Sequence, residues 1–226
     1  MKVRPLSREE VRSLDARAIQ EYHLPTIVLM ENAGRGAASW LRDRIGRDRG
    51  RVVIACGPGN NGGDGGVVAR HLDAWGFEVR VAWFVDPSKL KGDAATQREI
   101  LDRAGIATQI IGDDAPLEVI NALWMEADWL VDGLLGTGLT RPVEGLLARA
   151  IDSMNRSGRP ILALDLPSGL DADRGEPLGV AIRATATATF VAPKLGFDAE
   201  GARDYTGEVV VVDIGAPRAL LKSFSA

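Results

Sequence analysis

Apolar runs and amphipathic stretches alternate along most of the chain, beginning at residue 51. A short continuous apolar run predicts a buried strand, and an apolar residue every three or four positions predicts a helix. We therefore expect strands at 51–56, 78–85, 107–111, 129–132 and 161–165. The stretches between them predict helices that end near Trp75, span 94–104, run from a cap at Asp114 to about Glu126, and span 144–155. Strands alternating with helices predict a parallel sheet with helices on both faces.

Two further helices are predicted ahead of this alternating region. Ser7-Arg8-Glu9-Glu10 has the spacing of a capping box, which predicts a helix from there to about Glu21. A second helix should begin at Pro25-Thr26 and reach Trp40. It contains Gly34 and Gly36, each of which costs about 1 kcal/mol of helix propensity relative to alanine, so we expect a close neighbour there. Both helices should form an extension packed on the same core.

The last part of the chain predicts two more strands, at 185–192 and 208–213, with no clear helix between them. We expect them to extend one edge of the sheet, and this stretch leaves an antiparallel direction open. No linker, internal repeat or low-complexity tract divides the sequence. The prediction is a single domain over residues 1–226.

Composition narrows the class of protein. Of the 226 residues, 46% are hydrophobic, enough for a full core, and the net charge of -4 argues against a broad nucleic-acid-binding surface. There is no apolar signal segment and no run of about 18 apolar residues, so we expect no membrane association and a soluble, cytoplasmic protein. Cys56 is the only cysteine and ends an apolar run, which predicts a buried, inert thiol.

Three of the predicted strands end in unusual segments, "GPGNNGGDGG" at 57–66, "DGLLGTGLTRP" at 132–142 and "DLPSGLDAD" at 165–173. Ligands of open parallel sheets bind beyond the carboxyl ends of the strands. We therefore expect all three segments to face the same crevice.

The first of these segments matches a dinucleotide fingerprint through Gly57, Gly59 and Gly62. Glycines there allow a tight turn and let backbone N–H groups approach phosphate at a helix N-terminus. Asp86 ends the next strand, where an acid that binds ribose would sit. The alternative is a strand-to-helix turn with no ligand. The segment lacks the Gly-Lys-Ser/Thr ending of a P-loop, and Asp64 would repel a phosphate unless it faces a neutral part of the ligand or caps the helix.

The side chains in these segments are rich in oxygen, which is the ligand type that hard cations prefer. They are Asn60, Asn61, Asp64, Asp132, Asp165 and Ser168. Because Asp132 and Asp165 each close an apolar strand, we favour a role in the site over a structural one. Asp171 and Asp173 are interpreted as turn residues, and His71 as a helix-face residue. For Arg141 and Lys194, a role in the crevice and a purely structural role stay open.

With these segments in place, the sequence resembles the NAD(P)H-hydrate epimerases, also called the YjeF N-terminal domain family. The resemblance runs from "LMENAGRGAA" through "GPGNNGGDGG", "VDGLLGTGLTRPVEG" and "DLPSGLDADRG" to "FVAPKLGF". It implies a Rossmann-like three-layer α/β/α fold, usually dimeric. It also implies interconversion of the R and S epimers of hydrated NADH or NADPH, so that a dehydratase can repair the S form, and a bound potassium ion, K+.

Carried over by position, the resemblance implies roles for individual residues. Substrate contacts would come from Asn60, Asn61, Gly62, Gly63 and Asp64, phosphate contacts from Gly136, Thr137, Gly138, Leu139, Thr140, Arg141 and Pro142, and potassium ligands from Asn61, Asp132 and Ser168. Asp165 would face the reacting ring. We expect it to act as acid for the departing hydroxyl and as base for the returning water. Val191 departs from the pattern, because the family more often has glycine there.

Two other functions compete with this interpretation. An NAD-dependent oxidoreductase could use the same glycine fingerprint, but it would need a proton relay, and neither Tyr22 nor Tyr205 falls in the three segments. A non-catalytic scaffold is the second alternative, since related domains occur in RNA-decay proteins; the intact strand-end acids argue against it. The dehydratase domain often fused to bacterial relatives is absent from this sequence. We expect a separate dehydratase to do that work, or the sequence to be part of a longer chain.

Overall fold

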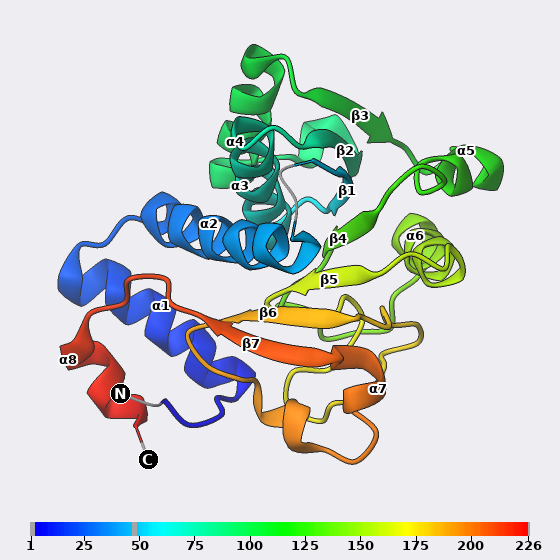
Figure 1. Cartoon of the computed structure of the whole chain (residues 1–226). Helices are drawn as coiled ribbons and strands as arrows, with labels where there is room; N and C mark the ends of the chain where they lie inside the picture. The colour runs from blue at the N-terminus through cyan, green and yellow to red at the C-terminus, as the bar shows by residue number, and fades with distance from the viewer. Residues whose placement is uncertain (1–2, 47–48, 226) are drawn as a thin grey trace.

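The computed structural model describes residues 3–46 and 49–225, and its centre is one parallel sheet (Figure 1). Within the described residues the sheet has seven strands in the order β3-β2-β1-β4-β5-β6-β7. Every neighbouring pair is parallel. The strands are β1 (Arg51–Cys56), β2 (Glu78–Phe84), β3 (Ala107–Ile111), β4 (Trp129–Gly133), β5 (Ile161–Leu164), β6 (Ala186–Phe190) and β7 (Glu208–Val212).

Helices cover both faces of the sheet, which gives the expected three layers (Figure 1). The α-helices are α1 (Arg8–Tyr22), α2 (Thr26–Ile45), α3 (Asn60–Ala74), α4 (Gly92–Ala104), α5 (Leu117–Ala122), α6 (Gly145–Arg156), α7 (Arg203–Thr206) and α8 (Arg218–Leu221). Short 3₁₀ turns are η1 (Pro87–Lys89), η2 (Leu195–Asp198) and η3 (Lys222–Phe224). The buried side chains of α1 to α4 share one hydrophobic cluster with one face of the sheet, and those of α5 and α6 share a second with the other face.

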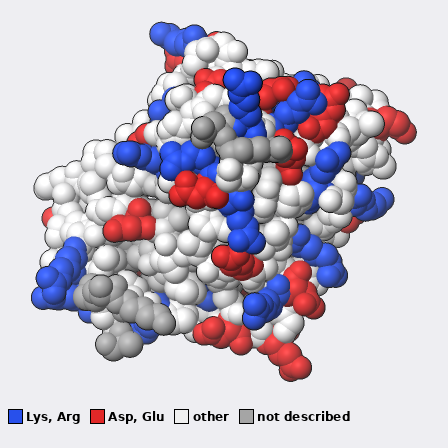
Figure 2. Space-filling view, viewed as in Figure 1, with Lys and Arg blue, Asp and Glu red and all other residues white. Residues whose placement is uncertain are grey.

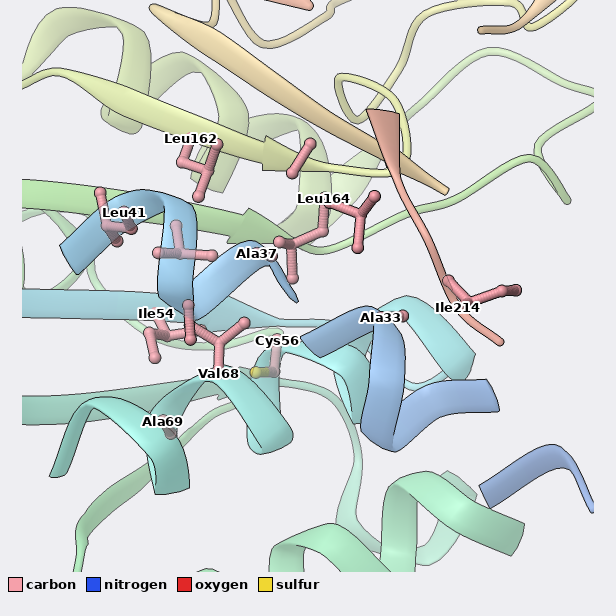
Figure 3. Close-up of a cluster of buried hydrophobic side chains, with 14 of the residues drawn as sticks. Ala33, Ala37, Leu41, Ile54, Cys56, Val68, Ala69, Leu162, Leu164 and Ile214 are labelled. Atoms are coloured by element: carbon pink, nitrogen blue, oxygen red, sulfur yellow. The ribbon is translucent and has the colours of Figure 1, made fainter. Parts of the chain in front are cut away.

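The two clusters follow from alternation along the buried strands. In β1, Ile54 and Cys56 join the first cluster, while Val53 and Ala55 join the second. Figure 3 shows the first cluster, with Ala33, Ala37 and Leu41 of α2 near Ile54 and Cys56 of β1 and near Val68 and Ala69 of α3. Cys56 is buried, as predicted, and burial raises the pKa of its thiol well above its usual range, which disfavours the reactive thiolate.

Close packing explains the two glycines inside α2, as predicted. A Cβ at Gly34 would lie 2.5 Å from the Cβ of Val67 on α3, and one at Gly36 would lie 2.3 Å from a methyl carbon of Val212 on β7. The capping box is also confirmed, because the Ser7 side chain accepts from the Glu10 N–H and the Glu10 carboxylate accepts from the Ser7 N–H. The N-terminal helices thus pack on the common core.

The direction of the last strands resolves the alternative that the sequence left open: β6 and β7 are parallel to the rest, and an antiparallel edge is wrong. Parallel neighbours need a crossover of about a dozen residues or more, but that crossover need not be a long helix. Before β7 it is made of η2 and the four-residue α7, and before β6 it is loop.

Two smaller expectations are wrong. Asp114 does not cap α5, which begins after Pro116 without a side-chain cap and ends at Ala122. The segment 57–66 is loop only at its start, since α3 begins at Asn60. No helix in the described ranges is long and apolar enough to cross a membrane. Figure 2 shows basic and acidic side chains interspersed over the visible face.

Candidate functional site

The strand order reverses between β1 and β4, and a pocket lies beyond the carboxyl ends of the strands near this point. Its volume is about 600 Å³, within the range of sites for small molecules and cofactors. All three unusual segments contribute to its wall, as predicted. The wall includes Pro58 to Asn61 and Asp64, Leu134 to Arg141, Asp165, Phe190 and Val191, together with side chains of α1 and α2 and Asp93 of α4.

The glycine segment forms the first two turns of α3 and not an extended phosphate loop. A Cβ at Gly62 would lie 2.0 Å from the carbonyl oxygen of Gly57, and one at Gly63 would lie 2.4 Å from the terminal methyl of Met30. Neither glycine lines the pocket or has a positive φ. They let the start of α3 pack tightly, which places Asn60, Asn61 and the first N–H groups of the helix at the pocket.

The three residues expected to bind potassium belong to one hydrogen-bonded chain. Ser168 donates to the Asp132 carboxylate through its N–H (2.8 Å) and its hydroxyl (2.6 Å). Leu135 N–H donates to the Ser168 hydroxyl (2.8 Å), and the Asn61 amide donates to the Leu135 carbonyl (2.8 Å). Burial raises the pKa of Asp132 to about 6, against the lowering effect of these donors and of the Leu134 N–H.

One buried side-chain atom in this hydrogen-bonded network lacks a hydrogen-bond partner. The Asn61 Oδ1 is buried and accepts no hydrogen bond in the structure. An unpaired buried carbonyl is costly, and the buried carboxylate of Asp132, connected to Asn61 through Leu135 and Ser168, offers further oxygen atoms to a cation. The donor set, an amide oxygen, a carboxylate and a hydroxyl, is the hard oxygen set that suits an alkali or alkaline-earth ion. The residues present therefore fit a potassium site.

Asp165 stands at the end of β5 with a buried ammonium beside it. Lys194 Nζ lies 2.5 Å from Asp165 Oδ1, and its side chain is completely buried. The ammonium also donates to Thr189 Oγ1 (2.9 Å) and to the carbonyls of Phe190 and Ala192 (both 3.3 Å). Lys194 does not line the pocket itself: it lies buried behind Asp165, in the segment after β6, and contacts the pocket wall only through this ion pair.

Two neighbouring strand ends carry strained turns. Leu166 N–H donates to the Leu164 carbonyl around Asp165, whose φ is 64°. Ala192 N–H donates to the Phe190 carbonyl around Val191, whose φ is 66°. Both are γ-turns with a positive central φ, a rare and strained conformation. Val191, at a position where the resemblance implies glycine, therefore adopts a backbone conformation that glycine adopts readily.

Four carboxyl groups line the pocket, those of Asp15 of α1, Asp64 of α3, Asp93 of α4 and Asp165. Burial, followed by the charges of Asp165 and Asp15, raises the pKa of Asp64 well above its usual range, which favours its neutral form. Asp15 was missed from the sequence, where it is one more polar residue on an amphipathic helix; no local pattern distinguishes it.

Some of the remaining predicted residues line the pocket, and the others lie outside it. Gly136 to Arg141 line the pocket, whereas Pro142 does not. Asp86 is exposed and accepts from the N–H and hydroxyl of Ser88, so it is a turn residue. The interpretation of His71 as a helix-face residue is confirmed by its contact with Glu31 (2.8 Å) outside the pocket. Asp171 and Asp173 lie outside the pocket and in the turn, as predicted. The Asp171 carboxylate accepts from the Asp173 and Arg174 N–H groups and from the Arg8 guanidinium, and the Asp173 carboxylate accepts from the Arg8 N–H.

The sequence and fold match known proteins over most of the chain. The family model described as YjeF-related protein N-terminus matches residues 26–196. A protein named NAD(P)H-hydrate epimerase from Rhodopirellula baltica is 43% identical over 222 residues, covering 98% of this chain and 88% of that protein. One of the same name from Pirellula staleyi is 45% identical over 219 residues, covering 97% and 96%.

Two further similarities concern a longer protein and a solved structure. A protein named bifunctional NAD(P)H-hydrate repair enzyme, from Thermofilum pendens, is 41% identical over 222 residues, which cover 98% of this chain and 42% of that protein. The crystal structure of the yeast protein ynu0 superposes with a TM-score of 0.82 at 21% identity, covering 99% of this chain and 94% of that one. The second similarity supports the three-layer fold.

Proposed function

Because the chain belongs to the family described as YjeF-related protein N-terminus, we propose that it is an isomerase that interconverts the R and S epimers of hydrated NADH or NADPH. The substrate carries a hydroxyl on the ring carbon beside a nitrogen. Loss of this hydroxyl as water gives a flat cation, and water can return from either side. Such a reaction needs a proton donor and a proton acceptor at the ring.

The observation that carries this proposal is Asp165 at the pocket wall with Lys194 beside it. The 2.5 Å ion pair fixes the carboxylate, and the Phe190 N–H donates to the same oxygen (3.2 Å). A positioned carboxyl that gives and takes a proton contributes about 100- to 10,000-fold in rate. The strained φ of Asp165 is of the kind that clusters at active sites.

The rest of the pocket suits a dinucleotide. The start of α3 offers N–H groups and a positive helix end, and Arg141 adds a side chain able to bind phosphate bidentately. We assign substrate contacts to Asn60, Asn61 and Asp64 and phosphate contacts to residues 136–141. Gly62 and Gly63 act indirectly, by allowing α3 to start where it does.

We further propose that potassium binds to Asn61, Asp132 and Ser168. The unpaired, buried Asn61 Oδ1 supports this, as does its connection to the other two residues through Leu135. When bound, the ion would supply a positive charge beside Asp132 and fix the segments after β1, β4 and β5 relative to one another. The substrate pocket would then keep its shape.

An oxidoreductase is less well supported by this geometry. Hydride transfer coupled to a carbonyl or hydroxyl substrate needs a proton relay, often histidine or tyrosine. In the described part of the chain neither histidine and neither tyrosine lines the pocket. A second copy of the chain as partner, and a dehydratase that consumes the S epimer, complete the proposal; relatives named as bifunctional repair enzymes support the latter.

The direct test is to incubate the protein with the R epimer of hydrated NADPH and to follow the epimer ratio by chromatography. We expect equilibration well above the spontaneous rate. Asp165→Asn should bring the rate close to the spontaneous one, while Asp152→Asn, a surface change on α6, should not alter it. Spontaneous rates with the unsubstituted protein would refute the proposal, and full activity of Asp165→Asn would remove Asp165 as the acid–base group.

Potassium binding can be tested without activity. A ligand that binds only the folded state at 100 times its Kd stabilises it by about 2.7 kcal/mol. The melting temperature should therefore be higher in potassium chloride than in tetramethylammonium chloride at equal ionic strength. Asp132→Asn should lose this difference, and Asp152→Asn should keep it. Equal melting temperatures in the two salts for the unsubstituted protein would contradict the site.

A further inference from the structure

The N-terminal helix contributes a carboxyl group to the pocket. Leu14 and Ala18 are buried and hold α1 on the core, and Asp15, next to Leu14, lines the pocket. Asp15 is open to the water of the pocket and makes no hydrogen bond or ion pair with the described residues. Helix α1 precedes residues 26–196, the part matched by the family model.

The surroundings of Asp15 favour a proton on it. Desolvation at the pocket wall, followed by the negative charge of Asp165, raises its pKa to about 6, and the charge of Lys194 acts in the opposite direction. At pH 7 a carboxyl of this kind is protonated in about one molecule in ten, and the ionised form serves as a base. The charged or titratable groups around it are Arg12 of α1, Asp64 of α3, Asp93 of α4, Arg141, Asp165 and Lys194.

A single fixed carboxyl meets only one side of a flat ring. Epimerisation removes the hydroxyl from one side and returns water to the other, so one group needs the ring to turn over or a second group on the far side. On the basis of the proposed epimerisation, we propose that Asp15 is a second catalytic carboxyl, which exchanges a proton with the ring oxygen on the side that Asp165 does not reach.

The step balances without a co-reactant. Protonated Asp15 gives its proton to the ring hydroxyl, the C–O bond breaks with its electron pair leaving on water, and the ring nitrogen forms a C=N bond. On the other side a water oxygen bonds to the carbon, Asp165 takes a proton from that water, and the C=N pair returns to nitrogen. The two carboxyls end with exchanged protonation states, which is the starting state for the reverse direction.

Asp64 does not fit this role, although it lies nearby. It is 8% exposed and is held within the second turn of α3, and burial raises its pKa well above its usual range. A carboxyl buried in this way favours its neutral form, which suits it to donate a hydrogen bond to the substrate and not to cycle between acid and base. Asp15 is both open to the pocket and able to adopt either form.

The kinetic test compares Asp15→Asn with two other variants. We expect Asp15→Asn to lower kcat about 100-fold or more, Asp15→Glu to restore part of it, and Glu9→Gln, which removes another acid of α1, to leave it unchanged. The dissociation constant for NADPH should stay the same within about threefold, because Asp15 does not hold phosphate. One proton shared by two carboxyls predicts a bell-shaped pH profile of kcat/KM, and Asp15→Asn should lose the limb at higher pH.

The possible failures are distinct. If the unsubstituted protein does not exceed the spontaneous rate, the proposed function and the role of Asp15 both fall. If it is active and Asp15→Asn matches it, only the role of Asp15 is overturned. A titration of the Asp15 carboxyl by ¹³C NMR gives a check without activity: the midpoint should lie near 6 and fall in Asp165→Asn, whereas a midpoint near 4 in both proteins would overturn the proposal.

Discussion

Val191 offers a direct measurement of the strain at the pocket wall. Its φ of 66° places a β-branched residue in a conformation that costs L residues about 1–2 kcal/mol. Replacing it by alanine keeps the Cβ and the strain, whereas replacing it by glycine removes both. Glycine in turn makes the unfolded chain more flexible, which costs about 0.4–1 kcal/mol. We therefore expect Val191→Gly to be more stable than Val191→Ala by about 1 kcal/mol.

Relative to the unsubstituted protein, both variants also lose the packing of the valine side chain. Val191 is half-buried against the first hydrophobic cluster, so removing its side chain loses about 1 kcal/mol of burial. The glycine variant should then lie near the unsubstituted protein in stability, and the alanine variant about 1 kcal/mol below it. For a chain of this size a difference of 1 kcal/mol corresponds to about 2–4 °C in melting temperature.

Urea denaturation of both variants is the assay. Ala148→Gly, at a position with ordinary helical geometry in α6, is the matched control and should lose about 1 kcal/mol. Changing alanine to glycine should therefore raise the free energy of unfolding at position 191 and lower it at position 148. An alanine variant at 191 as stable as the glycine variant, or more stable, would show that the turn is not strained.

Three more changes test other parts of the structure. Gly62→Val should lower stability severely and not only abolish NADPH binding, because its Cβ would meet the Gly57 carbonyl; Gly59→Ala, whose Cβ meets nothing within 4 Å, should melt normally. Lys194→Met should cost about 3–5 kcal/mol in urea denaturation, since it leaves a buried carboxylate unpaired. The pKa of Asp15 is raised from 3.8 to about 6 on folding, so its stabilising effect is present below pH 4 and lost as the pH rises to 6; unfolding curves of Asp15→Asn should not show this loss.

Much of the fold was accessible from the sequence, because buried parallel strands are continuous apolar runs. The five alternating strands, the capping box at Ser7 and the convergence of three strand-end segments all follow from local patterns. The direction of β6 and β7 did not, because their connections carry no periodic helix to reveal a crossover. The glycine segment misled for a related reason, since six glycines indicate a loop whereas tertiary packing holds most of them in a helix.

The site was predictable only where a residue ends a strand. Asp132 and Asp165 each follow an apolar run, and the topology then brings them to one edge. Asp15 lies on an amphipathic helix rich in polar residues, where nothing in the sequence distinguishes it. The burial of the Lys194 side chain depends on how the segment after β6 folds back. Such neighbours are set by contacts between residues far apart in the chain, which no local pattern records.

Contacts between segments far apart in the sequence have a consequence for synthesis of the protein. Leu6 bridges to Lys194 and Val3 to Ser225. At about 5–20 residues per second, a ribosome needs roughly 10–40 s to reach Lys194 after it has made Leu6. During that time the first helix lacks its contact with the segment after β6, and the pocket wall is complete only after Ile214, its last lining residue in sequence order, has been made.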